Sequence, residues 1–148
     1  MNFSEFKLIA ISDLRPMLER IEGNPPFKFL IVSMVSSQKT EDREFLARVL
    51  GAVQLTLESE VALLEIGPDE LPPLSALINH TGATYILCFG TEAEQLGIRA
   101  GIQLYTPTLL NGCHYLFADS LSLIRETREK GDNKRAGALW TAIKQWLL

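Results

Sequence analysis

The chain has 148 residues, of which 47% are hydrophobic and 22% are charged, so it is long enough to bury a core and its composition excludes a disordered or fibrous protein. Its 18 acidic residues outnumber its 14 basic ones and give a formal net charge of −4, which argues against a protein that binds the phosphate backbone of nucleic acids non-specifically. No signal peptide or membrane span is recognisable, which predicts a cytoplasmic protein with no membrane contact.

The first half of the chain alternates between helical and strand patterns. Helical spacing of apolar residues predicts a helix over residues 11–22, which the following Gly-Asn-Pro-Pro ends. A nearly continuous apolar run over residues 27–35 predicts a central parallel strand. Residues 40–57 predict a helix with an acidic first turn, residues 61–66 a second strand, and residues 74–78 a short helix.

The second half of the chain continues this alternation. Residues 84–89 give the strongest strand pattern in the sequence, and residues 92–96 predict a short helix. Residues 102–105 predict an edge strand and residues 115–117 a further short strand. After a polar stretch, residues 135–148 form an amphipathic pattern that predicts a terminal helix.

Strands separated by helices indicate a mainly parallel sheet with helices on both faces, which is a three-layer αβα arrangement. No internal repeat, low-complexity tract or linker interrupts this pattern. We therefore predict a single α/β domain over residues 27–148, preceded by an N-terminal segment and helix over residues 1–26.

Ligands of open α/β sheets bind beyond the carboxyl ends of the strands, and this predicts that any pocket lies there. The candidate residues are Ser36, Gln38, Gly90, Thr91, Asp119 and Ser120. The first strand is not followed by the glycine pattern of a phosphate-binding loop or a dinucleotide site. The two histidines, His80 and His114, lack partners at metal-ligand spacing, and no nucleophile elbow is present. We therefore predict no catalytic residue, no metal and no cofactor.

Five basic residues gather in the last quarter of the chain, at Arg125, Arg128, Lys130, Lys134 and Arg135. They alternate with acidic residues, so the sequence allows either a local basic patch or a solvated face beside a helix.

Aromatic residues near the two ends of the chain are candidates for contacts with partners or bases. The spacing of the two tryptophans favours a core position for Trp140 and leaves both a core and a stacking role open for Trp146. Phe3 and Phe6 stand outside any amphipathic pattern. They are either anchors that dock on a partner or part of a frayed tail.

Two segments resemble the uracil-DNA glycosylase superfamily. Residues 86–96 (Ile-Leu-Cys-Phe-Gly-Thr-Glu-Ala-Glu-Gln-Leu) look like its hydrophobic strand, glycine and short helix, and residues 115–125 with 133–140 look like its closing strand, loop and last helix. The resemblance implies that superfamily's fold, with a four-stranded sheet in the order 2-1-3-4. Where the superfamily has its catalytic His-Pro, this chain has Ala118-Asp119, and Ser33-Met-Val-Ser-Ser-Gln-Lys replaces the water-activating loop. The fold is therefore expected without the reaction.

The psi subunits of bacterial DNA polymerase III clamp-loader complexes are a catalytically silent family with this fold, and the run Ala138-Leu-Trp-Thr-Ala-Ile is similar to their closing segment. This resemblance implies a replication accessory subunit that binds the clamp-loader ATPase subunit and a chi-like or single-strand-binding protein, with direct DNA binding weak or absent. By analogy, Phe3, Phe6 and Leu8 would dock on the ATPase. The alternatives are a divergent DNA glycosylase or related hydrolase that acts on a nucleobase through Asp119 or a residue near Gln38, and a small-ligand module.

Overall fold

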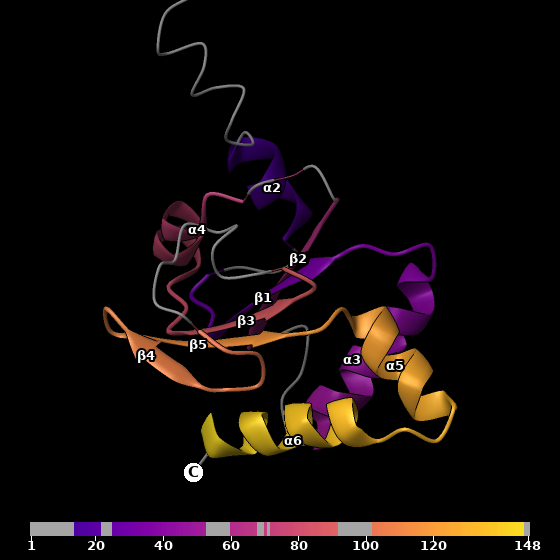
Figure 1. Ribbon diagram of the computed structural model, residues 1–148. Helices are drawn as coiled ribbons and strands as arrows, with labels where there is room; N and C mark the ends of the chain where they lie inside the picture. Colours follow the sequence, from indigo (N-terminus) through magenta and orange to yellow (C-terminus); the bar gives the residue numbers. More distant parts are fainter. Residues whose placement is uncertain are drawn as a thin grey trace, which may run out of the picture.

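The computed structural model describes residues 14–21, 25–52, 60–67, 70, 72–91 and 102–146 (Figure 1). The helices are α2 (Leu14–Arg20), α3 (Lys39–Ala52), α4 (Leu74–Thr81), α5 (Leu121–Glu129) and α6 (Lys134–Trp146). The strands are β1 (Phe29–Met34), β2 (Val61–Ile66), β3 (Tyr85–Phe89), β4 (Thr108–Leu110) and β5 (Cys113–Ala118). Phe3, Phe6, Leu8 and the helix predicted over residues 92–96 lie outside the described residues.

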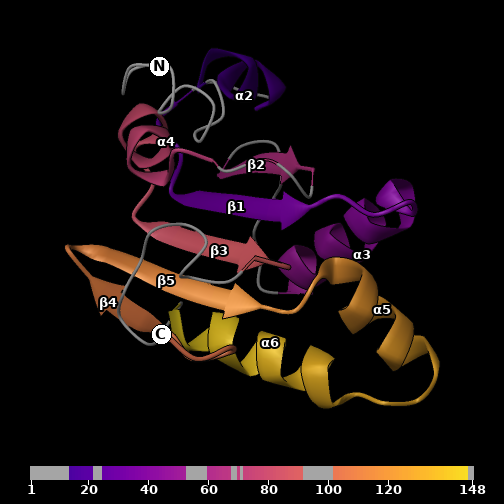
Figure 2. The ribbon, with the colours of Figure 1, turned by 45° about the horizontal axis from the view of Figure 1, so that its top comes forward.

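The strands form one mixed sheet in the order β2-β1-β3-β5-β4. The first four strands in this order run parallel, and β4 pairs antiparallel with β5. In Figure 2 the arrowheads of β1, β3 and β5 point to the end of the molecule where α3 and α5 begin. The predicted α/β class and mainly parallel sheet are confirmed, whereas the predicted four strands in the order 2-1-3-4 are wrong, because β4 adds a fifth strand at the edge.

The additional strand arises from a tight hairpin between β4 and β5. Asn111 and Gly112 at its turn have φ values of 50° and 80°, which is the left-handed pair that a two-residue hairpin requires. An Asn-Gly pair between apolar residues is therefore the signal that the sequence interpretation missed. The edge strand predicted over residues 102–105 is wrong, since Tyr105 has a φ of 60° and lies in a turn.

Helices cover both faces of the sheet and give the molecule three layers (Figure 1). On one face, α3, α5 and α6 pack against side chains that include Ile31, Leu87 and Leu116. On the other face, α2 and α4 pack against the alternate side chains of the same strands, such as Leu30 and Val32. Since β1 is buried on both sides, its sequence is almost continuously apolar.

Helix α5 was not predicted, because its sequence carries few apolar residues. Only Leu121, Ile124 and Arg125 are buried, at the spacing of one helical face. Its start is fixed by Ser120, whose side-chain oxygen accepts a hydrogen bond of 3.2 Å from the backbone N–H of Leu123. The polar stretch that follows β5 therefore forms a helix that is capped at its start and packs on α3 and α6.

Helix α6 buries Leu139, Ala142 and Ile143 and leaves Trp140 41% exposed. The predicted core position of Trp140 is therefore wrong, because the buried face of the helix turns away from it. Trp146 is half-buried and packs against Tyr85, with ring centroids 5.3 Å apart. Among the described residues, no helix has the length and apolar character needed to cross a membrane.

Candidate functional site

The ends of β1, β3 and β5 meet at Gly90, where the sequence predicted a pocket. Gly90 has a φ of 79°, and a Cβ atom there would lie 3.2 Å from Met34 Cβ and 3.3 Å from Ser120 Cβ. Its backbone N–H donates a 3.0 Å hydrogen bond to the carbonyl of Ala118. Glycine is favoured here because a side chain would be strained in this conformation and would make tight contacts with both neighbours. The strand ends are thus packed directly against one another.

Next to this junction, a buried carboxylate joins α3 to α5. Asp42 accepts hydrogen bonds of 2.7 Å from the hydroxyls of Ser36 and Ser122 and one of 3.1 Å from Arg125 Nε. Asp42 and Arg125 are each only 6% exposed. The carboxylate is hydrogen-bonded to side chains of the same domain. The Ser36 hydroxyl therefore has a structural role, as a donor to Asp42.

The guanidinium of Arg125 is satisfied from several sides. Besides Asp42, it donates to Gln38 Oε1 and, over 3.3 Å, to Glu129. Burial acts to lower the pKa of Arg125, but hydrogen bonds to Asp42 and Glu129 outweigh this effect, and the net pKa lies above its ordinary value. Arg125 therefore stays charged, and Gln38 is held by it.

Asp119 follows β5, and its carboxylate interacts with two donor groups. Its carboxylate accepts a 2.6 Å hydrogen bond from the Tyr105 hydroxyl and lies 3.3 Å from Arg135 Nε. The strained backbone of Tyr105 is held by a 2.7 Å hydrogen bond from its N–H to the Phe117 carbonyl. Burial and the Asp119 carboxylate both raise the pKa of the Tyr105 hydroxyl above its ordinary range, so Tyr105 remains a proton donor to Asp119.

Thr91 lies at the end of β3 beside Cys88, and both side chains are buried. Burial raises the pKa of the Cys88 thiol to about 12, against a lesser opposing effect of the Thr91 hydroxyl. The described residues give that hydroxyl no hydrogen bond of ordinary geometry. The thiol is protonated at neutral pH and is a packing group.

The six predicted pocket residues thus fall into separate groups. Ser36 and Gln38 belong to the Asp42–Arg125 network, Gly90 contacts Ser120, and Asp119 turns to Tyr105 and Arg135. The described residues contain no group of three or more His, Cys, Asp or Glu side chains that could hold a metal ion.

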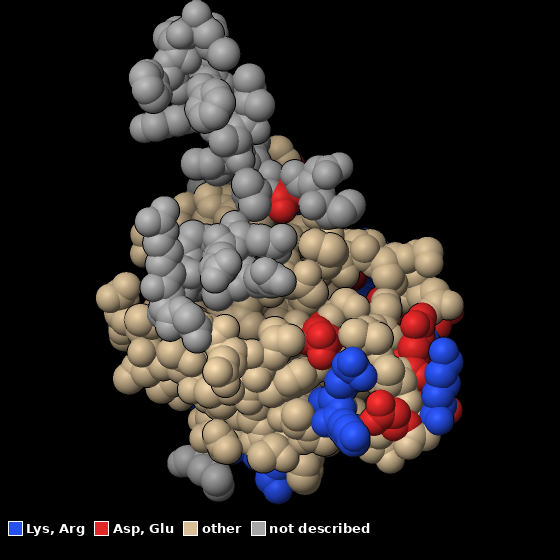
Figure 3. Space-filling model, viewed as in Figure 1, with Lys and Arg blue, Asp and Glu red and all other residues tan. Residues whose placement is uncertain are grey.

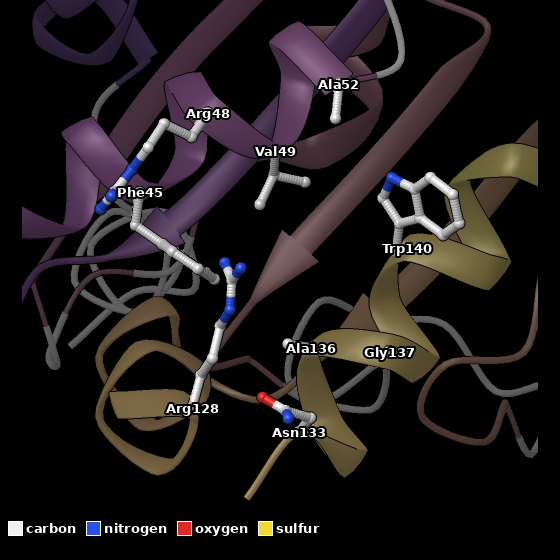
Figure 4. A pocket seen from close by; sticks show the side chains of 9 residues that line it. All are labelled: Phe45, Arg48, Val49, Ala52, Arg128, Asn133, Ala136, Gly137 and Trp140. Carbon is white, nitrogen blue, oxygen red and sulfur yellow. The ribbon is translucent and has the colours of Figure 1, made fainter. Parts of the chain in front are cut away.

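A groove lies elsewhere on the surface, and we call it the α3–α6 groove. It has a volume of about 520 Å³ and is lined by Phe45, Arg48, Val49, Ala52, Arg128, Asn133, Ala136, Gly137 and Trp140. Figure 4 shows the Arg128 side chain rising from α5 into the space between α3 and α6, with Trp140 across from it. A second groove of about 630 Å³ runs between residues 105–107 and the other side of α6. None of the six predicted pocket residues lines either groove.

The basic residues of the last quarter do not act as one patch. Arg125 is buried, and Arg135 lies 3.3 Å from Asp119 and 3.8 Å from Asp132. Figure 3 shows acidic and basic side chains next to one another at this end of the molecule. Arg128 lines the α3–α6 groove, and Lys134 lines the second groove.

The chain matches no model of a known protein family, and no curated protein matches it at a significant level. The function therefore has to be argued from the residues themselves.

Proposed function

We propose that the chain is a non-catalytic accessory subunit that works by binding other proteins, within a DNA-replication complex as its resemblance to the psi subunits implies. The observation that carries the proposal is that polar side chains at the carboxyl ends of the parallel strands are already hydrogen-bonded within the fold. Enzymes of this class present reactive groups there. Here Ser36, Asp119 and Ser120 are engaged in hydrogen bonds that hold α3, α5 and the loop before β4 in place.

Apolar surface at the sheet edge supports a protein-binding role. Leu109 in the outermost strand β4 is 63% exposed, and Leu104 nearby in the chain is 46% exposed. Leu109 thus offers an apolar contact on the edge strand of the sheet, where a partner chain can bind. The predicted docking residues Phe3, Phe6 and Leu8 lie outside the described residues, so their role rests on the sequence.

The test is recovery of the tagged full-length protein from its native cells at near-physiological salt, followed by identification of its partners. We expect the clamp-loader ATPase subunit, together with a chi-like or single-strand-binding protein. A variant that lacks residues 1–8 should lose the ATPase, and Leu109→Glu should weaken any partner that pairs with β4. Full recovery of the ATPase by the truncated protein would contradict docking through the N-terminal segment. Recovery of no replication protein by the intact chain would overturn the replication role.

The glycosylase alternative is tested with uracil-containing and deaminated-base oligonucleotides. We expect no abasic sites even at high protein concentration, because the Asp119 carboxylate is already bound by Tyr105 and Arg135. Abasic sites that form with the natural protein and disappear in Asp119→Asn would replace the accessory-subunit proposal with an enzyme.

A further inference from the structure

The α3–α6 groove joins an apolar surface to two positively charged side chains. Val49, Ala52 and Ala136 form aliphatic parts of its wall, and Trp140 is 41% exposed beside them. None of the described residues that line the groove is acidic. An apolar surface rimmed by polar groups is typical of a protein-interaction site.

The two arginines of the groove come from different helices. Arg48 of α3 and Arg128 of α5 are both exposed, and no ion pair to either guanidinium is found among the described residues. The neighbouring Arg125 is fully engaged with Asp42 and Glu129. Because guanidinium groups bind carboxylates with strong, directed hydrogen bonds, this pair is complementary to an acidic ligand.

We infer that the α3–α6 groove is the docking site for a short acidic peptide segment of a partner protein. An apolar side chain of the segment packs against Val49 and Trp140, and two carboxylates next to it in the segment bind Arg48 and Arg128. The volume of about 520 Å³ is within the range of sites that hold a few side chains. The inference rests on the proposed role of the chain as a protein-binding subunit and adds the chemistry of one partner.

The charge of the chain favours a short peptide over a nucleic acid in this groove. Lys144 Nζ lies 4.0 Å from the centroid of the Trp140 ring, so one face of the indole is covered and the other face is available to an apolar side chain. The net charge of −4 repels a long polyanion, whereas a short segment meets mainly the two local arginines.

The test uses the purified full-length protein and a fluorescein-labelled peptide with the alternating sequence Glu-Leu-Glu-Phe-Glu-Leu. Fluorescence anisotropy measures its Kd, and competition with the unlabelled peptide excludes binding through the dye. We expect saturable binding that weakens as salt is raised. The same peptide with Lys at every Glu should not bind. An unlabelled single-stranded oligonucleotide should not displace the acidic peptide.

Matched variants locate the binding. Arg48→Ala/Arg128→Ala should weaken it about tenfold, from two exposed ion pairs of ordinary strength, while Lys130→Ala, outside the groove, should leave it unchanged. Gly137→Leu places a side chain in the groove and should abolish binding. Gly51→Leu is the matched control, because both glycines lie in helices with no atom within 4 Å of a Cβ there, and only Gly137 lines the groove. Circular dichroism confirms that each variant is folded.

Binding lost in Gly137→Leu and retained in Gly51→Leu supports the inference. The inference is overturned by an acidic peptide that does not bind, by equal binding to Gly137→Leu, or by displacement with the oligonucleotide, which would assign the groove to nucleic acid. These results are separate from those of the proposed function. Peptide binding without recovery of replication proteins supports the groove and removes the replication role, whereas recovery of those proteins by a chain that binds no peptide removes the groove inference alone.

Discussion

Arg125 and Arg128 lie one turn apart on α5 and belong to two contrasting regions. The first region is the α3–α5 contact, where Arg125 is 6% exposed and meets Asp42, Gln38 and Glu129. The second is the α3–α6 groove, where the exposed Arg128 has no ion pair among the described residues and stands beside apolar walls. The same residue type is part of a buried hydrogen-bond network in the first region and is exposed in the second.

The contrast separates the part of the fold that holds itself together from the part that is free to bind. A buried charge is tolerated only where partners replace the water it has lost, so the α3–α5 contact has one stable arrangement. An exposed arginine keeps its water and exchanges it for a carboxylate when a ligand arrives. Mutations in the first region should therefore change stability, and mutations in the second should change binding.

The largest effect is expected from Asp42→Ala, which disrupts the α3–α5 contact. The substitution leaves Arg125 buried without its main counter-charge and removes the acceptor of the Ser36 and Ser122 hydroxyls. We expect the free energy of unfolding to fall by about 3–5 kcal/mol, measured by chemical denaturation. Glu129→Ala is the control, because its side chain is 62% exposed, and it should cost less than about 1 kcal/mol.

A second variant shows whether the loss comes from the unpaired charge. Asp42→Leu/Arg125→Met replaces the ion pair with apolar side chains and should recover much of the stability that Asp42→Ala loses. A double variant as unstable as Asp42→Ala would show that Asp42 acts through its serine partners and not through Arg125.

The second-largest effect is expected from Gly90→Ala, at the point where the ends of β1, β3 and β5 pack together. The added Cβ would meet Met34 and Ser120 at 3.2 and 3.3 Å, in a backbone conformation with a φ of 79°. We expect a loss of roughly 2–4 kcal/mol from conformational strain and overpacking together. Gly112→Ala separates the two causes, since its φ is 80° and nothing lies within 4 Å. Equal losses in both variants would contradict the close packing at Gly90.

Much of the fold could be predicted from the sequence, because periodicity reports burial. The run that forms β1 is apolar on both faces, and β2 was predicted with its observed bounds, Val61–Ile66. The failures have local causes. The hairpin depends on the left-handed backbone of Asn111 and Gly112 and not on an apolar pattern. Helix α5 depends on the Ser120 cap and on a buried Arg125, which composition alone assigns to the surface.

The binding groove could not be predicted, because it depends on three helices whose relative placement no local pattern encodes. Arg48 and Arg128 are 80 positions apart in the chain and line the same groove. Trp140 was assigned to the core together with Leu139 and Ile143 because of their spacing in α6, yet the structure buries Leu139 and Ile143 and leaves Trp140 41% exposed. The candidate residues follow β1, β3 and β5 in the structure, but no sequence pattern encodes the hydrogen bonds that they make there.

A smaller effect is the pH dependence of stability that comes from Cys88. This residue is buried in β3, two positions before Gly90. Burial raises the pKa of its thiol from 9.0 to about 12 in the folded chain. Well below pH 9 the thiol is protonated in both the folded and the unfolded state and contributes no pH dependence. As the pH rises further, the unfolded chain releases the proton first, and stability should fall by about 1.4 kcal/mol per pH unit. Denaturation between about pH 9 and pH 11 should show a slope shallower by about one proton in Cys88→Ala; an unchanged slope would contradict the burial of the thiol.

The smallest effect is expected from Arg128→Ala, and it decides whether the two regions differ as proposed. Because this guanidinium is exposed and has no ion pair among the described residues, its removal should change the free energy of unfolding by less than about 0.5 kcal/mol. Arg125→Ala, one turn earlier, should cost several times more, since it leaves Asp42 buried and unpaired. Denaturation of the two variants under identical conditions measures the difference. A loss for Arg128→Ala close to that of Arg125→Ala would make Arg128 a structural residue and would remove the main reason to regard the α3–α6 groove as open for a ligand.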